Sequence, residues 1–203
     1  MPITSDDFWG SAGRGDLERI QYHLDHGVDI NARGQAGINA LGYAAFEGHA
    51  SAVRLLLARG ADPNGTGYMD GMPIGLAAWA GQALCIELLL DAGADINRGH
   101  ATNGESPLHH ASIKNRIEAV AILLERGAEV NHRASDGGIT ELMPEETLSG
   151  ETPLHMAAVG GSVALILALL AGGADSSIQT HRGESPRDLA RRIHREEEII
   201  AAL

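Results

Sequence analysis

Aromatic residues and cysteine are both scarce in this sequence of 203 residues. Aromatics make up 3% of it, and Cys85 is its one cysteine. A single cysteine cannot form a disulfide within the chain, and residues 1–7 lack the basic and apolar regions of a secretory signal, so we expect a cytoplasmic protein. Because aromatics are few, a core must be built mainly from Ala, Leu, Ile and Val, which favours closely packed helices.

Long hydrophobic runs and an excess of positive charge are also missing. No apolar run reaches the roughly 18 residues that a membrane span needs, so we expect no membrane partner. The chain has 15 Lys and Arg against 27 Asp and Glu, which gives a formal charge of −12. This charge repels a phosphate backbone, so nucleic acid is not an expected ligand, and it favours encounter with a basic protein.

The compact motifs of nucleotide, zinc and hydrolase sites are absent too. The chain has no Walker-type loop, no cysteine pair at zinc spacing, no His-Glu-x-x-His helix and no Gly-x-Ser-x-Gly elbow. His23 and His26 have the spacing of a weak metal pair, but no clear third ligand accompanies them. The sequence therefore predicts no catalytic residue, no metal and no cofactor.

What the sequence does contain is an internal repeat of about 33 residues. One motif consists of glycine, a small or β-branched residue and an acid, usually followed two residues later by asparagine. It begins at Gly27, Gly60, Gly93, Gly127 and Gly173. A second motif runs in phase with it and reads Ser106-Pro107-Leu108-His109-His110-Ala111 and Thr152-Pro153-Leu154-His155-Met156-Ala157-Ala158, with looser copies at residues 39–45, 72–78 and 185–190.

Elementary helix chemistry explains both motifs. Ser or Thr caps a helix start and Pro fits the first helical position, so the second motif predicts a short helix packed closely through its alanines. A second apolar helix, such as residues 53–57, follows each one. The glycine of the first motif then ends that second helix in the left-handed conformation, and a turn begins.

Together the two motifs resemble ankyrin repeats over essentially the whole chain. The resemblance implies an all-α solenoid of about six helix-turn-helix units including two caps, with finger loops and one long finger insertion. The units are expected within a single domain, residues 1–203, at about 4–33, 34–66, 67–99, 100–133, 149–179 and 180–203, with the insertion at 134–148. The resemblance also implies that His49, His109 and His155 make structural hydrogen bonds.

Departures from the repeat point to a functional surface, since ligands of this family meet the finger tips and the end of the first helix. Phe46, Trp79 and Ile113 occupy the same position in three successive repeats, and we expect Ile38, Tyr68 and Met69 beside them. This arrangement predicts an apolar groove for a partner. The alternative is that these side chains pack under the neighbouring fingers.

Two further departures concern the insertion and a pair of glycines. The insertion 134–148 contains both acidic and apolar residues. One interpretation is a flap over the groove, and the alternative is a tolerated surface loop. The family's histidine is replaced by Gly42 and Gly75; we expect Trp9 to fold over Gly42, while a small-ligand pocket near Gly75 is the alternative. The candidate partner-binding residues are Ile38, Phe46, Glu47, Tyr68, Met69, Asp70, Trp79, Ile113, Glu141, Met143 and Glu145.

The leading hypothesis is a protein-protein interaction module that binds one protein partner, with a basic surface favoured, through its concave face. A second hypothesis is an inhibitor or immunity protein that occludes a basic enzyme site. A third is an atypical enzyme or small-molecule binder that uses the aromatic groove under the 134–148 loop. An exposed aromatic ladder would also allow a homodimer.

Overall fold

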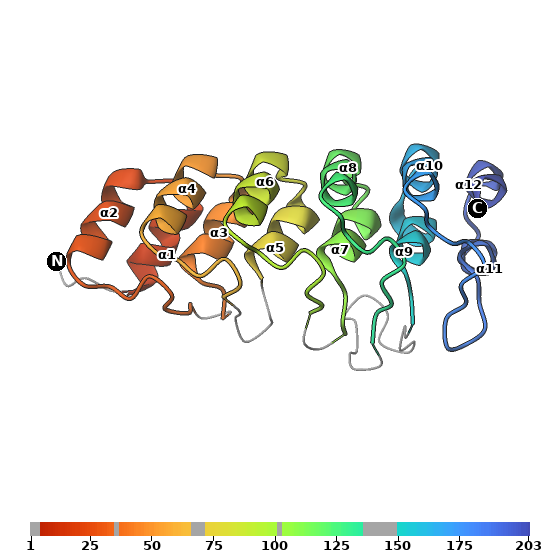
Figure 1. Cartoon of the computed structure of the whole chain (residues 1–203), viewed down its shortest axis with the longest axis horizontal. Coiled ribbons are helices and arrows are strands. Elements are labelled where there is room, and N and C mark those ends of the chain that lie inside the picture. The colour runs from red at the N-terminus through yellow and green to blue at the C-terminus, as the bar shows by residue number, and fades with distance from the viewer. Residues whose placement is uncertain (1–4, 35–36, 66–71, 101–102, 136–149) are drawn as a thin grey trace. The chain divides into compact units, whose positions relative to one another are not determined.

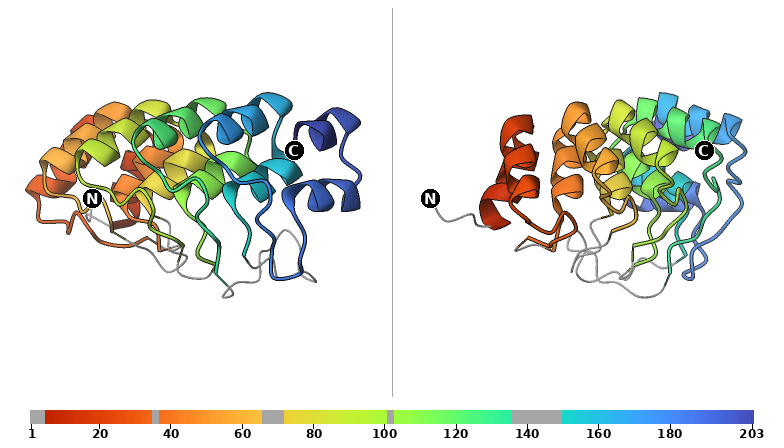
Figure 2. Two further views of the ribbon diagram at one scale, coloured as in Figure 1. Left: turned by 45° about the vertical axis from the view of Figure 1, so that its right-hand side comes forward. Right: turned by 60° about the vertical axis from the view of Figure 1, so that its left-hand side comes forward.

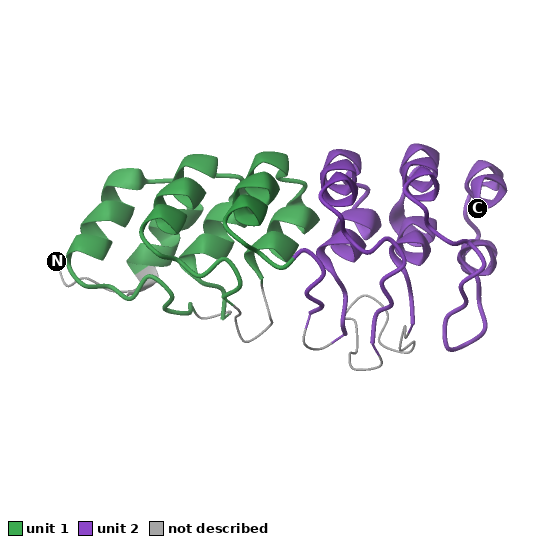
Figure 3. Ribbon diagram, viewed as in Figure 1, with its two compact units in different colours: residues 1–95 green, residues 96–203 purple. Residues whose placement is uncertain are grey.

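The protein forms paired helices joined by finger-like loops. The computed structural model describes residues 5–34, 37–65, 72–100, 103–135 and 150–203. In these ranges it contains twelve α-helices and, as its one β pairing, an isolated bridge between Arg33 and Asn39. The all-helical prediction is confirmed. The chain divides into two compact units, residues 1–95 and 96–203, which are described one at a time (Figure 3).

Unit 1 consists of three helix pairs arranged in two layers (Figure 1). The first helices of the pairs pack side by side in one layer, and the second helices form the other, with the fingers extending past the first layer. The first helices are α1 (Ser5–Gly13), α3 (Ala40–Glu47) and α5 (Pro73–Ala80), and the second helices are α2 (Leu17–Asp25), α4 (Ala50–Ala58) and α6 (Ala83–Asp91).

Unit 2 repeats this plan with three further pairs, and Figure 2 shows the two layers of each unit from two other directions. Its first helices are α7 (Pro107–Ile113), α9 (Pro153–Gly160) and α11 (Pro186–Arg192), and its second helices are α8 (Ile117–Glu125), α10 (Val163–Ala171) and α12 (Glu197–Ala202). Since no helix of the described ranges combines the length and apolar character of a membrane span, the structure offers no transmembrane helix there.

The starts of α7 and α9 explain the Ser/Thr-Pro-Leu-His motif. The Nδ1 atom of His109 accepts hydrogen bonds from the backbone N–H of Ser106 (3.1 Å) and from its hydroxyl (2.9 Å). The Nε2 atom must then carry the proton, and it donates to the carbonyl of Glu151 (3.1 Å) in the next finger. His155 bonds Thr152 and the carbonyl of Glu184 in the same way. The structural role implied for these histidines is confirmed.

The turn motif builds a second connection between repeats. Gly60 and its equivalents adopt left-handed conformations, with φ of +91° at Gly60, as the sequence predicts. The amide oxygen of each turn asparagine accepts a bond from the backbone of the next turn. In unit 1, Asn31 Oδ1 accepts from Asp62 N at 2.9 Å. Because the asparagine satisfies a donor one repeat away, the motif aligns successive helix pairs.

The core of each unit is aliphatic, as the shortage of aromatics requires. Phe8 is the one fully buried aromatic side chain of the described ranges, and the other large ones are leucines and isoleucines. Among these, Leu41 and Ile74 lie in the first layer of unit 1, and Leu108 and Leu154 in the first layer of unit 2. Burial of each such side chain contributes about 1.5–3 kcal/mol, which is how stacking stabilises units that could not fold alone.

The expected position of Trp9 is wrong. Its ring lies against Gly34, where a Cβ atom would come within 3.1 Å of the indole, and its Nε1 donates to the carbonyl of Ala32 (3.1 Å). The space beside Gly42 is filled by Ile38 and Leu76 instead, which would lie 2.8 and 3.1 Å from a Cβ atom at that glycine. The indole N–H needs an acceptor when it is buried, and the finger backbone supplies one.

Candidate functional site

Phe46 and Trp79 occupy equivalent positions on two neighbouring helices of unit 1. Each lies seven residues after its helix cap, Asn39 for α3 and Met72 for α5, and α3 and α5 pack against each other. Phe46 is 38% exposed and Trp79 is half-buried. Shared register and shared layer therefore place two aromatic side chains on the same side of unit 1, and we call Phe46, Trp79 and Glu47 the finger-side surface.

The backbone beneath this surface is held from the second layer. Gln82, the residue before α6, donates its Nε2 hydrogen to the carbonyl of Phe46 (3.2 Å). His49 has the equivalent role in the preceding repeat, where its Nε2 lies 3.0 Å from the carbonyl of Gly13. These contacts satisfy carbonyls that a helix end leaves unpaired, so the backbone that carries Phe46 is held in place before any partner arrives.

The other predicted partner-binding residues that the structure describes in unit 1, Glu47 and Ile38, differ in how exposed their side chains are. Glu47 is exposed at the end of α3. Ile38 is half-buried, and its methyl group lies over Gly42, so some of this side chain already serves packing within the unit. For Ile38, packing within the fold is therefore a better interpretation than partner binding. The side chains of Phe46 and Glu47, in contrast, are exposed.

Ile113 lies at the end of α7 in unit 2, whereas Phe46 and Trp79 lie in unit 1. It is half-buried, and Gly160 of α9 lies directly against its carbonyl. The equivalent position on α9 carries Val159, which is also half-buried. Unit 2 therefore presents aliphatic side chains where unit 1 presents aromatic ones.

Six of the predicted contacts lie outside the described residues. They are Tyr68, Met69, Asp70, Glu141, Met143 and Glu145. The apolar groove that combined them with Phe46 and Trp79 therefore stays a prediction, as does the flap over it.

The insertion starts and ends at the base of one finger, and this base is described. Ala134 N donates to the carbonyl of Glu151 (2.8 Å), and Gly150 N donates to the carbonyl of Ala134 (3.0 Å). The next finger closes in the same way, with Thr180 N donating to the carbonyl of Glu184 (2.9 Å). The backbone pairing that closes a short finger is therefore also present around the long one.

We expect the fold to tolerate removal of the insertion. Replacing residues 136–149 with one glycine between Ser135 and Gly150 would give a turn as long as that between Thr180 and Glu184. Loop-closure entropy then predicts a free energy of unfolding equal to that of wild type or higher by about 1.5 kcal/mol. Urea titration measures this. A marked loss of stability would instead show that the insertion packs within the fold.

A polar cluster that the sequence did not single out lies under the fingers of unit 2. His110 Nε2 is 3.3 Å from Glu105 Oε2, and both side chains are mostly buried. Burial alone would raise the pKa of Glu105, but its hydrogen bond to His110 and the charge of His110 outweigh burial, so this pKa lies below its ordinary value. Glu151 is 2% exposed, and burial raises its pKa, with the charge of Glu105 adding to the effect.

This cluster could have been suspected from one signal. Glu105, Glu151 and Glu184 each follow a glycine and precede a Ser-Pro or Thr-Pro pair, so they share one register in unit 2. The repeat shows that they lie at equivalent positions, but whether each carboxyl has a cation nearby depends on side chains far along the chain. His110 is such a neighbour for Glu105, and Arg192 is one for Glu184 at 2.7 Å.

The chemistry available among the described residues is modest. Burial raises the pKa of the Cys85 thiol to about 11, so the thiolate needed for nucleophilic attack does not form at neutral pH. His109 and His155 are occupied at both ring nitrogens by the hydrogen bonds of the helix starts. Within the described ranges no group of three or more His, Cys, Asp or Glu side chains is placed to hold a metal ion.

Comparison with known families agrees with this architecture. A family model for ankyrin repeats (3 copies) matches residues 9–100 and 70–134, and another for ankyrin repeats (many copies) matches residues 108–170. The chain therefore belongs to the ankyrin-repeat family, whose members generally serve as protein-protein interaction modules and are typically not enzymes. No curated protein matches the sequence.

Proposed function

We propose that the protein is a cytoplasmic interaction module that binds one protein partner through the finger-side surface of unit 1. The observation that carries this proposal is the equivalent placement of Phe46 and Trp79 on the packed helices α3 and α5. Aromatic side chains dominate the energetics of interfaces, and a chain that is 3% aromatic keeps one of them 38% exposed here.

In the proposed mechanism, the helical scaffold presents the finger-side surface to the partner without changing its own backbone conformation. The helix ends that carry Phe46 and Gly13 are already bonded to Gln82 and His49, so the backbone there would need little further ordering on binding. Phe46 and Trp79 would supply affinity, and Glu47 would orient the partner at the rim. The net charge of −12 favours a partner with a basic surface, because long-range attraction raises the rate of encounter.

The test is capture of partners from the native lysate with wild type and with the Phe46→Ala/Trp79→Ala variant. We expect a protein that wild type retains and the variant loses while the variant stays folded, as its helical circular dichroism would show. Leu84→Ala is the matched control, since Leu84 is 51% exposed on α6, in the second layer of the same unit. A partner captured equally by all three proteins would show that the finger-side surface does not bind it.

The same experiment separates the inhibitor hypothesis from a general adaptor. If the protein lost with the variant is an enzyme whose activity falls when wild type is added, the chain acts by occlusion. The third hypothesis, a small-molecule binder under the insertion, makes a different prediction. Native mass spectrometry of the purified protein would then show a bound ligand that disappears when residues 136–149 are replaced.

A further inference from the structure

Helix α10 differs from the other second helices because it carries no charged or polar side chain. Its residues, Val163–Ala171, are all valine, alanine, leucine or isoleucine, whereas α2, α4, α6, α8 and α12 each carry at least one acid or arginine. A second helix packs one face on its neighbours and turns the other toward solvent, so polar residues are expected on the outer face. The outer face of α10 therefore departs from the repeat.

The register of the repeat shows which residue α10 has exchanged. Arg54 in α4, Glu87 in α6 and Leu167 in α10 each lie six residues before the turn glycine of their repeat. All three are exposed, and Leu167, at 53%, is the most exposed large hydrophobic side chain of the described ranges. A position that carries a charge in two repeats of unit 1 thus carries a leucine in unit 2.

Leu167 is part of a larger apolar surface. Ala164 and Ala171, one helical turn before and after it, are exposed, and so are Ile117 and Ala121 on α8, which packs beside α10 (Figure 1). Single apolar side chains on a surface are ordinary, but a contiguous set on neighbouring helices is typical of a binding surface. We call these five residues the α10 face.

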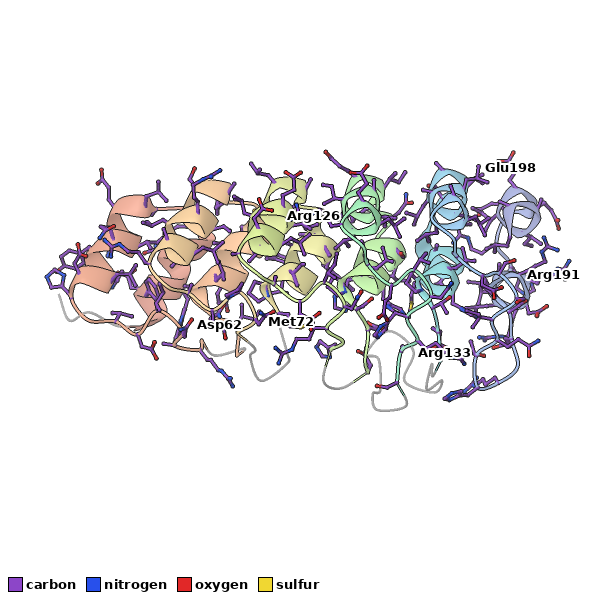
Figure 4. All side chains as sticks on the ribbon, viewed as in Figure 1. Asp62, Met72, Arg126, Arg133, Arg191 and Glu198 are labelled. Carbon is purple, nitrogen blue, oxygen red and sulfur yellow. The ribbon has the colours of Figure 1, made fainter. Side chains whose placement is uncertain are left out.

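Acidic side chains flank the α10 face on both sides. Glu118 and Glu125 are exposed on α8, and Glu197 and Glu198 are exposed on α12, which packs on the other side of α10. Glu198 is labelled in Figure 4, where it extends from α12 on the side away from the fingers. The apolar surface of α10 therefore lies between two helices that carry exposed carboxylates.

The basic residues of this layer lie at helix ends. The sequences of α8, α10 and α12 contain no lysine, arginine or histidine. Arg116 and Arg126 occupy the two caps of α8, and Arg195, which precedes α12, donates to carbonyls at the end of α9. Along the middle of the α10 face, the charges that an approaching molecule meets are therefore negative.

We propose that the α10 face binds an amphipathic helix of a protein partner, with the apolar stripe of that helix on Leu167 and lysines or arginines along its two edges. Helices pack through side chains spaced by three or four residues, the spacing that Ala164, Leu167 and Ala171 present. The alanines leave room on either side of Leu167 for larger side chains of the partner. The carboxylates of α8 and α12 favour basic edges and disfavour an acidic helix.

The same charges disfavour two other occupants. In a dimer formed through this face the glutamates of the two copies would meet, and the net charge of −12 repels an anionic membrane surface. The α10 face shares no residue with the finger-side surface of unit 1. Each proposal is tested with its own variants, so either can fail without the other.

The test is fluorescence anisotropy of the full chain with a labelled peptide of about 18 residues that has leucine and alanine on one helical face and lysine on both edges. We expect Leu167→Glu to weaken binding at least about tenfold, the smallest effect expected when a buried leucine contact is lost. An added negative charge by itself would tighten the binding of a cationic peptide. The direction of the change therefore separates apolar contact from charge.

Leu84→Glu is the matched control. It makes the same exchange at a position of α6 that is 51% exposed, and it should change the affinity less than about twofold. Equal weakening in both variants, or tighter binding in Leu167→Glu, would overturn the site. Leu167→Glu is expected to fold, since Glu87 occupies the equivalent position of α6, and circular dichroism checks this. Leu167→Ala adds no charge and should also weaken binding; wild-type affinity in that variant would contradict the proposal.

Further outcomes test the chemistry of the occupant. A peptide with the same apolar face but glutamate edges should bind at least about tenfold more weakly, and equal binding would contradict the role of the flanking acids. No measurable binding of the lysine peptide at low salt would overturn the proposal. So would a wild-type dimer that Leu167→Glu dissociates, seen by sedimentation, or recruitment to phosphatidylserine vesicles that Leu167→Glu abolishes.

Discussion

Gly160→Ala is expected to destabilise the protein by about 3 kcal/mol or more, the upper range for overpacking a tight contact. Gly160 ends α9, and a Cβ atom there would overlap the carbonyl oxygen of Ile113 at the end of α7. The obstacle is backbone, which cannot rotate away as a flexible side chain would. The ends of α7 and α9 would have to separate, and the packing between these helices would be lost.

The neighbouring contacts make this separation costly. Ser162, which follows Gly160 by two residues, donates from its N–H and its hydroxyl to Asn115 Oδ1 at 3.0 and 2.9 Å. Arg195 donates to the carbonyls of Ala158, Val159 and Gly161, so it caps the end of α9 from the other side. Moving α9 away from α7 would strain bonds on both sides at once.

Gly13→Ala is the matched control for this prediction. Gly13 also ends a first helix, and a Cβ atom there would meet Tyr43 Cβ at 3.8 Å, an ordinary contact. Alanine in a helix is favoured over glycine, so this change should leave stability unchanged or raise it by up to about 1 kcal/mol. Urea or thermal unfolding compares the two variants. Equal stability of Gly160→Ala and wild type would refute the tight approach of α9 to Ile113.

The second large effect is a loss of stability as the pH falls from 6.5 toward 4. Burial lowers the pKa of His109 to about 4, against an ordinary value near 6.5, and burial also lowers the pKa of His155. Between these pH values the unfolded chain binds a proton at His109 that the folded chain does not. The folded state therefore loses stability as the pH falls, and its full contribution from His109 is present above pH 6.5.

The expected size of this loss of stability follows from the difference between the pKa values of His109 in the folded and unfolded chain. Between pH 7 and pH 5 the contribution of His109 amounts to about 2 kcal/mol. His109→Gln removes the titrating group, so the variant should be less stable at pH 7 but show a smaller change between pH 7 and pH 5. Urea titrations at both pH values measure this. An unchanged pH dependence in the variant would mean that His109 is protonated within the fold.

Much of the fold could be predicted because the same local interactions recur in successive repeats. Ser106 and Thr152 cap their helices, and Gly60 and its equivalents turn left-handed, as the motifs predict. These are interactions between residues close in sequence. The longer bonds were not predictable from a motif: Arg195 reaches α9 across 34 residues, and the contact is visible only in three dimensions.

The candidate site shows the same limit. The register of Phe46 and Trp79 followed from counting along the repeat, and it places them on packed helices. Trp9 was misplaced because the sequence does not reveal which backbone carbonyl will satisfy its indole. The position of His23 was equally hidden. Its spacing from His26 is that of a weak metal pair on a helix face, yet His23 is 2% exposed and lies against Phe8, with Asp7 at 3.4 Å.

The most direct measurement of the central claim is site-specific photocrosslinking in the native cell. A photoreactive phenylalanine analogue would replace Trp79 in one variant and Leu84 in the other. These positions lie on α5 and α6 of the same helix pair, and Leu84 is the more exposed of the two. We predict a covalent adduct with one protein from position 79 and none from position 84. Adducts from position 84 alone would contradict binding through the finger-side surface.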